Sequence, residues 1–343
     1  MDLASGEVSQ NVLVRGCIRA LRVFPELDLI VVGDETILRN AFRRHKKLLG
    51  RTTIIHSIDV IAMHEDPATA VRSRPEASIV LAAGTVSSGR SFGLFSPGNT
   101  GATIAAATLG IGLLPGTLRA ALATILPTAR GQMLLLDVGA GVDLPPERYL
   151  CLGRLGEAFM TSLFGMAECR VCLLNIGEEP NKGTKVLKQT YALLEEHLAS
   201  FAGNIEPSDI FSGKADVVLC DGFIGNIFIK LCEGIGRQMQ RVIKQAAVSK
   251  TRPKQTREEL AREQSGKATR QTILRHLKKF TDPEAYGGAP LLGVRGIVLV
   301  GHGKTGPRAI YNAIAASLAL QRAGMIEKIE SGLASATAGN GCR

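Results

Sequence analysis

Four glycine-containing segments carry the side chains best suited to chemistry, and each follows a short apolar stretch. The first, residues 96–102 (SPGNTGA), precedes an apolar, helix-like run. Glycines let the backbone approach a ligand closely, and the first free N–H groups of a helix attract anions. Asn99 and Thr100 add hydrogen-bonding side chains. The SPGNTGA segment therefore indicates an anion-binding turn, and it fits an ordinary turn with a helix N-cap equally well.

The second segment, residues 175–183 (NIGEEPNKG), places two carboxylates and Lys182 between an expected strand and an expected helix. A lysine beside a helix N-terminus can help to neutralise a phosphate or a developing oxyanion. Taken alone, the NIGEEPNKG segment fits a surface loop equally well.

The third segment, residues 221–226 (DGFIGN), follows the strand-like residues 217–220. Asp221 and Asn226 flank two glycines there, so both side chains are candidates to face a small polar ligand. The alternative is that Asn226 only caps the helix that follows.

The fourth segment, residues 301–305 (GHGKT), lies between an expected strand and the final helix, with His302 at its opening. It ends like a P-loop, but that motif requires glycine at position 298, which is Val298 here. Nucleotide hydrolysis is therefore disfavoured. An anion-binding turn and a purely structural turn remain as interpretations.

Other common sites find no support in the sequence. No GxGxxG motif follows a first strand, which argues against a nicotinamide cofactor, and the nucleophile motif GxSxG is absent. Cys169 and Cys172 form a CxxC, yet no second ligand pair has the spacing of a zinc site. A zinc site and a nicotinamide cofactor are therefore disfavoured.

Length and composition favour an α/β protein. The chain has 343 residues, of which 45% are hydrophobic, 21% charged and 4% aromatic, with 38 glycines and no tryptophan. This excludes collagen, coiled-coil and disulfide-framework classes. The seven scattered cysteines and the lack of a secretory signal at the start of the sequence predict a cytoplasmic protein. The most apolar stretch, residues 102–118, is interrupted by glycines and Pro115, so a buried helix and turn are expected there rather than a membrane span.

Apolar strands alternate with helices along the chain, which predicts a mostly parallel sheet covered on both faces. We expect one catalytic domain over residues 1–330, with a helical insertion at about 226–280 and a flexible tail at 331–343. Expected strands cover 29–33, 52–56, 91–96, 121–127, 132–138, 170–176, 216–221 and 296–300, and the main expected helices cover 99–111, 145–165, 184–199 and 307–320. Because ligands bind where such strands end, we expect the four segments to converge on one pocket.

The positive charge is concentrated in one stretch. The chain carries 41 Lys and Arg against 31 Asp and Glu, a net charge of +10. Residues 237–279 contain thirteen of these bases and only three acids, so the rest of the chain is balanced. The pattern predicts two basic helices, at about 226–248 and 257–280. Three interpretations stay open, namely packing on a partner subunit, attraction to an acidic protein, and attraction to an anionic membrane surface. Nucleic acid is disfavoured because no aromatic side chains are interleaved.

Taken together, the segments SPGNTGA, LLNIGEEPNKG (173–183), ADVVLCDGFIGN (215–226) and YGGAPLLGVRGIVLVGHG (286–303) resemble the PlsX-type phosphate acyltransferases. The resemblance covers most of the chain in the expected order. It implies a three-layer α/β/α sandwich related to isocitrate and isopropylmalate dehydrogenases and to phosphotransacetylases. It also implies a homodimer with projecting helices, here the basic pair, and it implies neither a metal nor an organic cofactor.

The resemblance further implies a reaction in which acyl-[acyl carrier protein] and inorganic phosphate give acyl phosphate and the free carrier protein. The product would pass to a membrane glycerol-3-phosphate acyltransferase in phospholipid synthesis, so peripheral contact with the membrane is expected. Lys182 would hold phosphate and offset charge in the transition state, and Asn226 would polarise the thioester carbonyl. The anion-binding turn would comprise Ser96, Gly98, Asn99, Thr100 and Gly101, with Asp221 and His302 nearby.

The sequence departs from the family pattern at three places. Residues 2–7 look like a degenerate form of the segment DAMGGD without the strand before it, which predicts loss of a sheet member. Pro97 replaces an alanine, and Gly139-Ala140-Gly141 stands where GAN is usual. The missing first strand keeps open a catalytically impaired scaffold that binds membranes or acidic proteins. A second alternative keeps the fold but makes the chain a phosphotransacetylase that uses short acyl-CoA.

Overall fold

A computed structural model describes residues 1–166, 168–248 and 287–337 of the chain. Its main sheet has eight strands within these ranges, in the spatial order β3-β10-β9-β4-β5-β8-β6-β7. The strands are β3 (Gly93–Ser96), β10 (Ile297–Val300), β9 (Ala289–Leu292), β4 (Ala121–Thr128), β5 (Gly131–Leu136), β8 (Val217–Leu219), β6 (Val171–Leu174) and β7 (Phe201–Ile205). A separate pair, β1 (Leu29–Gly33) and β2 (Thr52–His56), is parallel.

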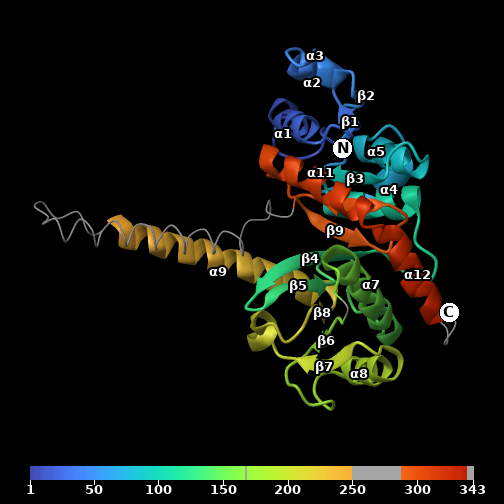
Figure 1. Cartoon of the computed structure of the whole chain (residues 1–343), viewed down its shortest axis with the longest axis vertical. Coiled ribbons are helices and arrows are strands. Elements are labelled where there is room, and N and C mark those ends of the chain that lie inside the picture. Colours follow the sequence, from blue (N-terminus) through green and yellow to red (C-terminus); the bar gives the residue numbers. More distant parts are fainter. Residues whose placement is uncertain (167, 249–286, 338–343) are drawn as a thin grey trace, which may run out of the picture.

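Helices cover both faces of the sheet, as Figure 1 shows. They are α1 (Gln10–Val23), α2 (Glu35–Phe42), α3 (Lys46–Leu49), α4 (Pro67–Ser73), α5 (Ser78–Ser87), α6 (Thr100–Ala106), α7 (Pro146–Phe164), α8 (Lys185–His197), α9 (Gly222–Val248), α11 (Pro307–Arg322) and α12 (Met325–Thr337). A π-helical turn (Ala107–Ile111) continues α6, and a 3-10 helix (Pro207–Ser212) precedes β8. The predicted α/β class with a mostly parallel sheet is confirmed.

The strands are apolar because both faces of the sheet are buried. Along β4, Leu122 and Leu126 pack into one hydrophobic cluster, while Ala123 and Ile125 pack into another on the opposite face. Alternate residues of a strand point to opposite faces, so continuous apolar runs are required where helices cover both. The third cluster joins α1 and β1, near the start of the chain, with α11, near its end.

The first residues of the chain make backbone hydrogen bonds to two strands. The Asp2 N–H donates to the carbonyl oxygen of Phe95 in β3 at 2.9 Å, and the Leu3 N–H donates to that of Val32 in β1, also at 2.9 Å. Residues 1–3 therefore lie between β1 and β3 and connect the small sheet to the large one. Residues 1–3 form no strand among the described elements, and Asp2 makes only an isolated parallel bridge with Val32.

Two antiparallel strands divide the sheet into blocks of opposite direction. β3 and β10 are parallel to each other, whereas β5, β8, β6 and β7 form a second parallel block. Between them, β9 and β4 pair antiparallel with each other and with their outer neighbours β10 and β5. The two blocks therefore run in opposite directions. The SPGNTGA and GHGKT segments therefore follow strands that end at one side of the sheet. The NIGEEPNKG and DGFIGN segments follow strands that end at the opposite side.

Helix α9 leaves the sheet and projects away from the body of the molecule (Figure 1). It covers the first predicted basic helix and begins at Gly222, four residues earlier than expected. The second, at 257–280, and most of the basic stretch lie outside the described residues. At the C-terminus, α12 extends to Thr337, so residues 331–337 are helical where the sequence predicted a flexible tail. Residues 338–343 lie outside the described part.

Candidate active site

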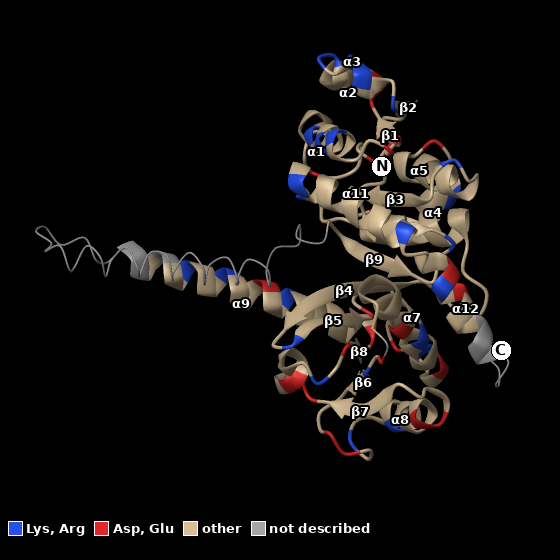
Figure 2. Cartoon of the chain, viewed as in Figure 1, with Lys and Arg blue, Asp and Glu red and all other residues tan. Residues whose placement is uncertain are grey.

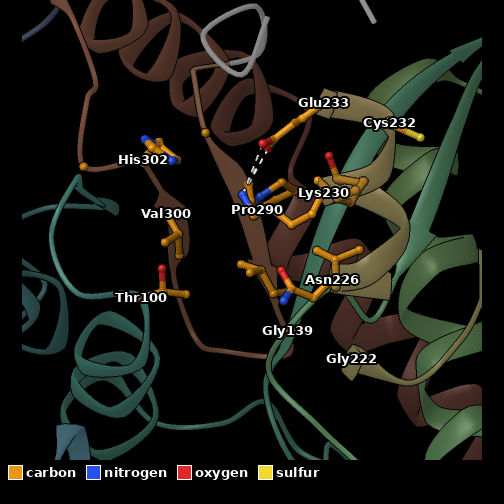
Figure 3. Close-up of a pocket in the computed structure, with 18 of the residues that line it drawn as sticks. Thr100, Gly139, Gly222, Asn226, Lys230, Cys232, Glu233, Pro290, Val300 and His302 are labelled. Carbon is orange, nitrogen blue, oxygen red and sulfur yellow. Dashed lines mark hydrogen bonds and ion pairs between the residues drawn. The ribbon is translucent and has the colours of Figure 1, made fainter. Parts of the chain in front are cut away.

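A cleft of about 660 Å³ lies between α9 and the ends of β3 and β10, with β4 and β9 as its floor. Figure 3 shows Thr100 and His302 on one side of it and Asn226 and Lys230 on the other. Its floor is mostly apolar. The predicted site residues that line it are Gly98, Thr100, Asn226 and His302.

The SPGNTGA segment is held from beneath by an aspartate near the chain start. The buried Ser96 hydroxyl donates to Asp2 Oδ2 at 2.7 Å, and the Gly98 N–H donates to Ser96 Oγ at 3.2 Å. Gly98 is required because a Cβ there would lie 2.5 Å from Ser5 Cβ. Ser96 therefore supports the turn, while Gly98 and Thr100 meet the cleft.

Asn99 serves as the helix cap that the sequence left open. Its Oδ1 accepts a hydrogen bond from the Ala102 N–H at 3.1 Å, and its Nδ2 donates to the Ala62 carbonyl oxygen at 2.9 Å. Gly101 packs against Pro67, where a Cβ would lie 2.6 Å from the proline ring. Neither Asn99 nor Gly101 lines the cleft.

Asp2 was not among the predicted site residues. Its side chain is fully buried, and its Oδ1 accepts from the N–H groups of Ala4 and Ser5 at 3.2 Å each. The sequence did draw attention to this segment, because residues 2–7 resemble a degenerate form of the family segment DAMGGD. Nothing in their spacing indicated that the carboxylate reaches Ser96.

The GHGKT segment presents an imidazole in a defined tautomer. His302 Nδ1 accepts a hydrogen bond from the Lys304 N–H at 3.2 Å, so a neutral His302 carries its proton on Nε2. The Thr305 N–H and hydroxyl both donate to the His302 carbonyl oxygen, at 2.8 and 2.6 Å. The Glu7 N–H donates to the Gly303 carbonyl oxygen at 2.8 Å, which brings the Glu7 side chain to the cleft wall. An exposed N–H donor therefore remains available on His302.

In the DGFIGN segment, Asp221 caps α9. Its Oδ1 accepts from the Ile224 N–H at 2.8 Å, and Asp221 does not line the cleft. The capping role considered for Asn226 thus belongs to Asp221, and Asn226 is exposed at the cleft instead. The sequence had left open whether Asn226 faces a ligand or caps the helix, because asparagine is a good cap.

Close packing at Gly222 and Gly225 sets the direction of the first turns of α9. The Gly222 N–H donates to the Gly141 carbonyl oxygen at 2.6 Å, and a Cβ on Gly225 would lie 2.0 Å from the Asp137 carbonyl oxygen. Only glycine allows this approach. The helix then crosses over the β4 side of the sheet, which brings Asn226 to the same cleft as Thr100 although their strands end at opposite edges.

Asp137 anchors the loop against which α9 packs. Its Oδ1 accepts from the N–H groups of Leu122, Gly139 and Ala140 at 3.0 to 3.2 Å. Burial raises the pKa of this carboxyl, and the three backbone donors only partly oppose that effect. Two residues of the Gly139-Ala140-Gly141 departure, Gly139 and Ala140, therefore bind Asp137 through their backbone N–H groups.

Two further charged residues of α9 were not predicted. Lys230 and Glu233 line the cleft, with Lys230 Nζ 3.2 Å from Glu233 Oε1 (Figure 3). The signal that could have found them is their spacing. Residues four and seven positions after Asn226 share its face of a helix.

The NIGEEPNKG segment lies at the opposite sheet edge and contributes no residue to the cleft lining. Lys182 is exposed, with its Nζ 3.8 Å from Glu179 Oε2. Asn175 holds the segment closed, because its Nδ2 donates to the Lys182 carbonyl oxygen at 3.2 Å. Three of the four segments therefore meet at the cleft, and the segment with Lys182 does not.

The described residues contain no group of three His, Cys, Asp or Glu side chains that could hold a metal ion. Cys169 and Cys172 are buried at the start of β6, and burial raises their pKa values to about 12 and about 11. Within the same part of the chain, no helix is long and apolar enough to cross a membrane.

Comparison with known proteins places the chain in a family. The family described as "Fatty acid synthesis protein" matches residues 1–328. The chain belongs to this family, that of the PlsX-type phosphate acyltransferases. A phosphate acyltransferase of Heliobacterium modesticaldum is 39% identical over 92% of this chain and 91% of its own length. One from Nitratiruptor sp. is 37% identical over 98% of both chains. The chain is therefore an acyltransferase enzyme, as the sequence predicted.

Solved structures support the fold of this phosphate acyltransferase family member. A phosphotransacetylase from Streptococcus pyogenes superposes with a TM-score of 0.60 at 15% identity, covering 95% of this chain and 94% of its own. The EutD phosphotransacetylase from Staphylococcus aureus gives 0.56 at 15% identity, covering 91% and 92%. At this identity the likeness concerns the fold alone.

Proposed function

We propose that the enzyme transfers an acyl group from acyl-[acyl carrier protein] to inorganic phosphate, giving acyl phosphate and the free carrier protein. The observation that carries this is the convergence of Gly98, Thr100, His302 and Asn226 on one cleft with an apolar floor. Backbone and side-chain donors suit an anion, and apolar residues such as Leu126 and Ile229 suit a fatty chain.

The reaction needs positioning and charge neutralisation rather than a strong base. Phosphate is already ionised at neutral pH, so one of its oxygens attacks the thioester carbonyl carbon directly. The C–S bond then breaks, and the carrier thiolate leaves and takes up a proton. In our proposal Asn226 donates from its amide to the carbonyl oxygen, and Thr100 and His302 Nε2–H bind phosphate oxygens.

Lys182 retains its proposed role as a cation that offsets charge at the reaction, although it lies outside the cleft of its own chain. Replacing Lys182 with alanine tests this role directly. Loss of phosphate-dependent turnover with an unchanged fold supports it, and normal turnover excludes it.

The surface of α9 supports the proposed partners. Four of its apolar side chains, Ile227, Leu231, Ile235 and Val242, are each about half exposed. Such a stripe on a projecting helix favours a second copy of the chain, and we propose a homodimer. Lys and Arg also recur along α9 (Figure 2), which suits an acidic carrier protein or an anionic membrane surface. We place the enzyme in the cytoplasm, in peripheral contact with the membrane where a glycerol-3-phosphate acyltransferase consumes the product.

The deciding experiment measures thioester cleavage that depends on inorganic phosphate. Long-chain acyl carrier protein and acetyl-CoA are compared as donors at equal concentration. Preference for the carrier substrate supports the proposal. Preference for acetyl-CoA identifies the phosphotransacetylase alternative, and no phosphate-dependent cleavage with either donor identifies a scaffold.

A further inference from the structure

The cleft carries an unusual balance of charge for a site that receives phosphate. Among the described residues that line it, Glu7 and Glu233 are carboxylates, and Lys230 has the only ammonium or guanidinium group. A phosphate dianion entering beside two carboxylates is repelled unless a cation offsets them. Lys182 is not part of this lining, so the carboxylates inside the cleft call for a further cation.

Lys230 lies where a cation inside the cleft is needed. It lies one helical turn after Asn226 on the same face of α9, and both side chains extend into the cleft toward the side that holds Thr100 and His302 (Figure 3). An ammonium group beside the proposed carbonyl donor is well placed for the oxygens of an attacking phosphate.

Glu233 forms an ion pair with the Lys230 ammonium, and this pair still allows Lys230 to contact a bound anion. Lys230 Nζ lies 3.2 and 3.3 Å from the two Glu233 carboxylate oxygens, and Arg237 Nη1 lies 3.5 Å from Glu233 Oε2. The Lys230 ammonium can turn from Glu233 toward an anion in the cleft. The side chain of Lys230 is about half exposed, so it is free to make that movement.

We infer that Lys230 is the cation that binds inorganic phosphate inside the cleft and offsets its charge as the acyl–phosphate bond forms. This inference rests on the proposed function. It adds a residue that the family resemblance had not supplied, and it separates the phosphate contact within the cleft from the role proposed for Lys182.

The test is steady-state kinetics with long-chain acyl carrier protein and inorganic phosphate as the varied substrate, for the full chain. Lys230→Ala should raise the KM for phosphate by about ten- to a hundredfold, the range expected for a charged hydrogen bond. Lys230→Arg should recover most of that loss, because it restores the charge. The matched control is Arg237→Ala, which removes the other cation bound to Glu233 and should leave the KM for phosphate within about twofold.

The outcomes separate this inference from the proposed function. Wild-type protein without phosphate-dependent cleavage refutes the proposed function itself. Wild-type activity together with an unchanged phosphate KM in Lys230→Ala refutes the inference, and so does an equal effect of Arg237→Ala. Unfolding curves for each variant must match the wild type, which is expected because both side chains are largely exposed.

Discussion

The Ser96 hydroxyl donates to the buried Asp2 carboxylate at 2.7 Å, across 94 residues of sequence. This contact fixes the turn that carries Gly98 and Thr100 to residues 2–5 of the chain. Asp2 is fully buried, so its oxygens depend on the donors that the protein provides.

Ser96→Ala should therefore destabilise the protein by about 1–3 kcal/mol, because it removes a donor from a buried carboxylate. Urea unfolding followed by circular dichroism measures the change. Ser88→Ala is the control, since Ser88 is exposed and its hydroxyl donates to backbone carbonyl oxygens of α5 rather than to a buried carboxylate. Equal unfolding midpoints for the two variants would contradict the importance of the Asp2 contact.

Two glycines of α9 should respond in opposite ways to alanine. Gly225→Ala places a Cβ 2.0 Å from the Asp137 carbonyl oxygen, so the helix must shift, at a cost of about 1–3 kcal/mol and most of the activity. Gly234→Ala meets open space and should stabilise the helix by up to about 1 kcal/mol. Thermal unfolding and phosphate-dependent turnover measure both. Identical behaviour of the pair would exclude close packing as the reason for Gly225.

Substitution of His302 by glutamine or by asparagine tests which of its ring nitrogens donates to phosphate. His302→Gln can place its amide NH₂ near the original Nε2, whereas the shorter asparagine side chain reaches only the Nδ1 position. We expect His302→Gln to retain about tenfold more activity than His302→Asn at limiting phosphate. The measurement is initial rate against phosphate concentration. A reversed order would place the functional nitrogen at Nδ1.

Acid should remove part of the stability through the Arg170–Asp216 pair. Burial by itself raises the pKa of Asp216, but the hydrogen bonds from the Arg170 side chain and backbone N–H outweigh it, and the net pKa is lowered. A carboxyl with a lowered folded-state pKa stabilises the fold fully above its unfolded pKa of about 3.9, and this stability is lost as the pH falls through the folded-state value.

Asp216→Asn should therefore be less stable than the wild type by a constant amount from about pH 5 to 7, and the difference should shrink below about pH 4. Urea unfolding across that range measures it. A difference that stays constant down to pH 2.5 would show that the charge of Asp216 does not contribute.

The sequence predicted the layers of the fold because both faces of the sheet are buried and its strands are apolar throughout. It did not predict β9, whose four residues include Pro290 and follow two glycines, so they resemble a turn. That strand and β4 reverse the sheet direction. Segments that all follow strands therefore leave opposite edges, which no local pattern reveals.

The candidate site was predictable to the extent that its residues follow strands or begin helices. Thr100, Asn226 and His302 were found in this way. Asp2 was not, because its partner Ser96 is distant in sequence. Lys230 was passed over, although its position four residues after Asn226 places it on the same face of the helix.

The pairing of β3 with β10, together with the packing of α1 on α11, has a consequence for synthesis of the chain. Within the first hundred residues, β3 pairs with β10 and α1 packs on α11, and both partners come from the last fifty residues. Residues 121–219, in contrast, already contain β4, β5, β6, β7 and β8 in one continuous stretch. On the ribosome the middle of the polypeptide can thus assemble its strands early, whereas β3 must wait for β10 until translation is nearly finished.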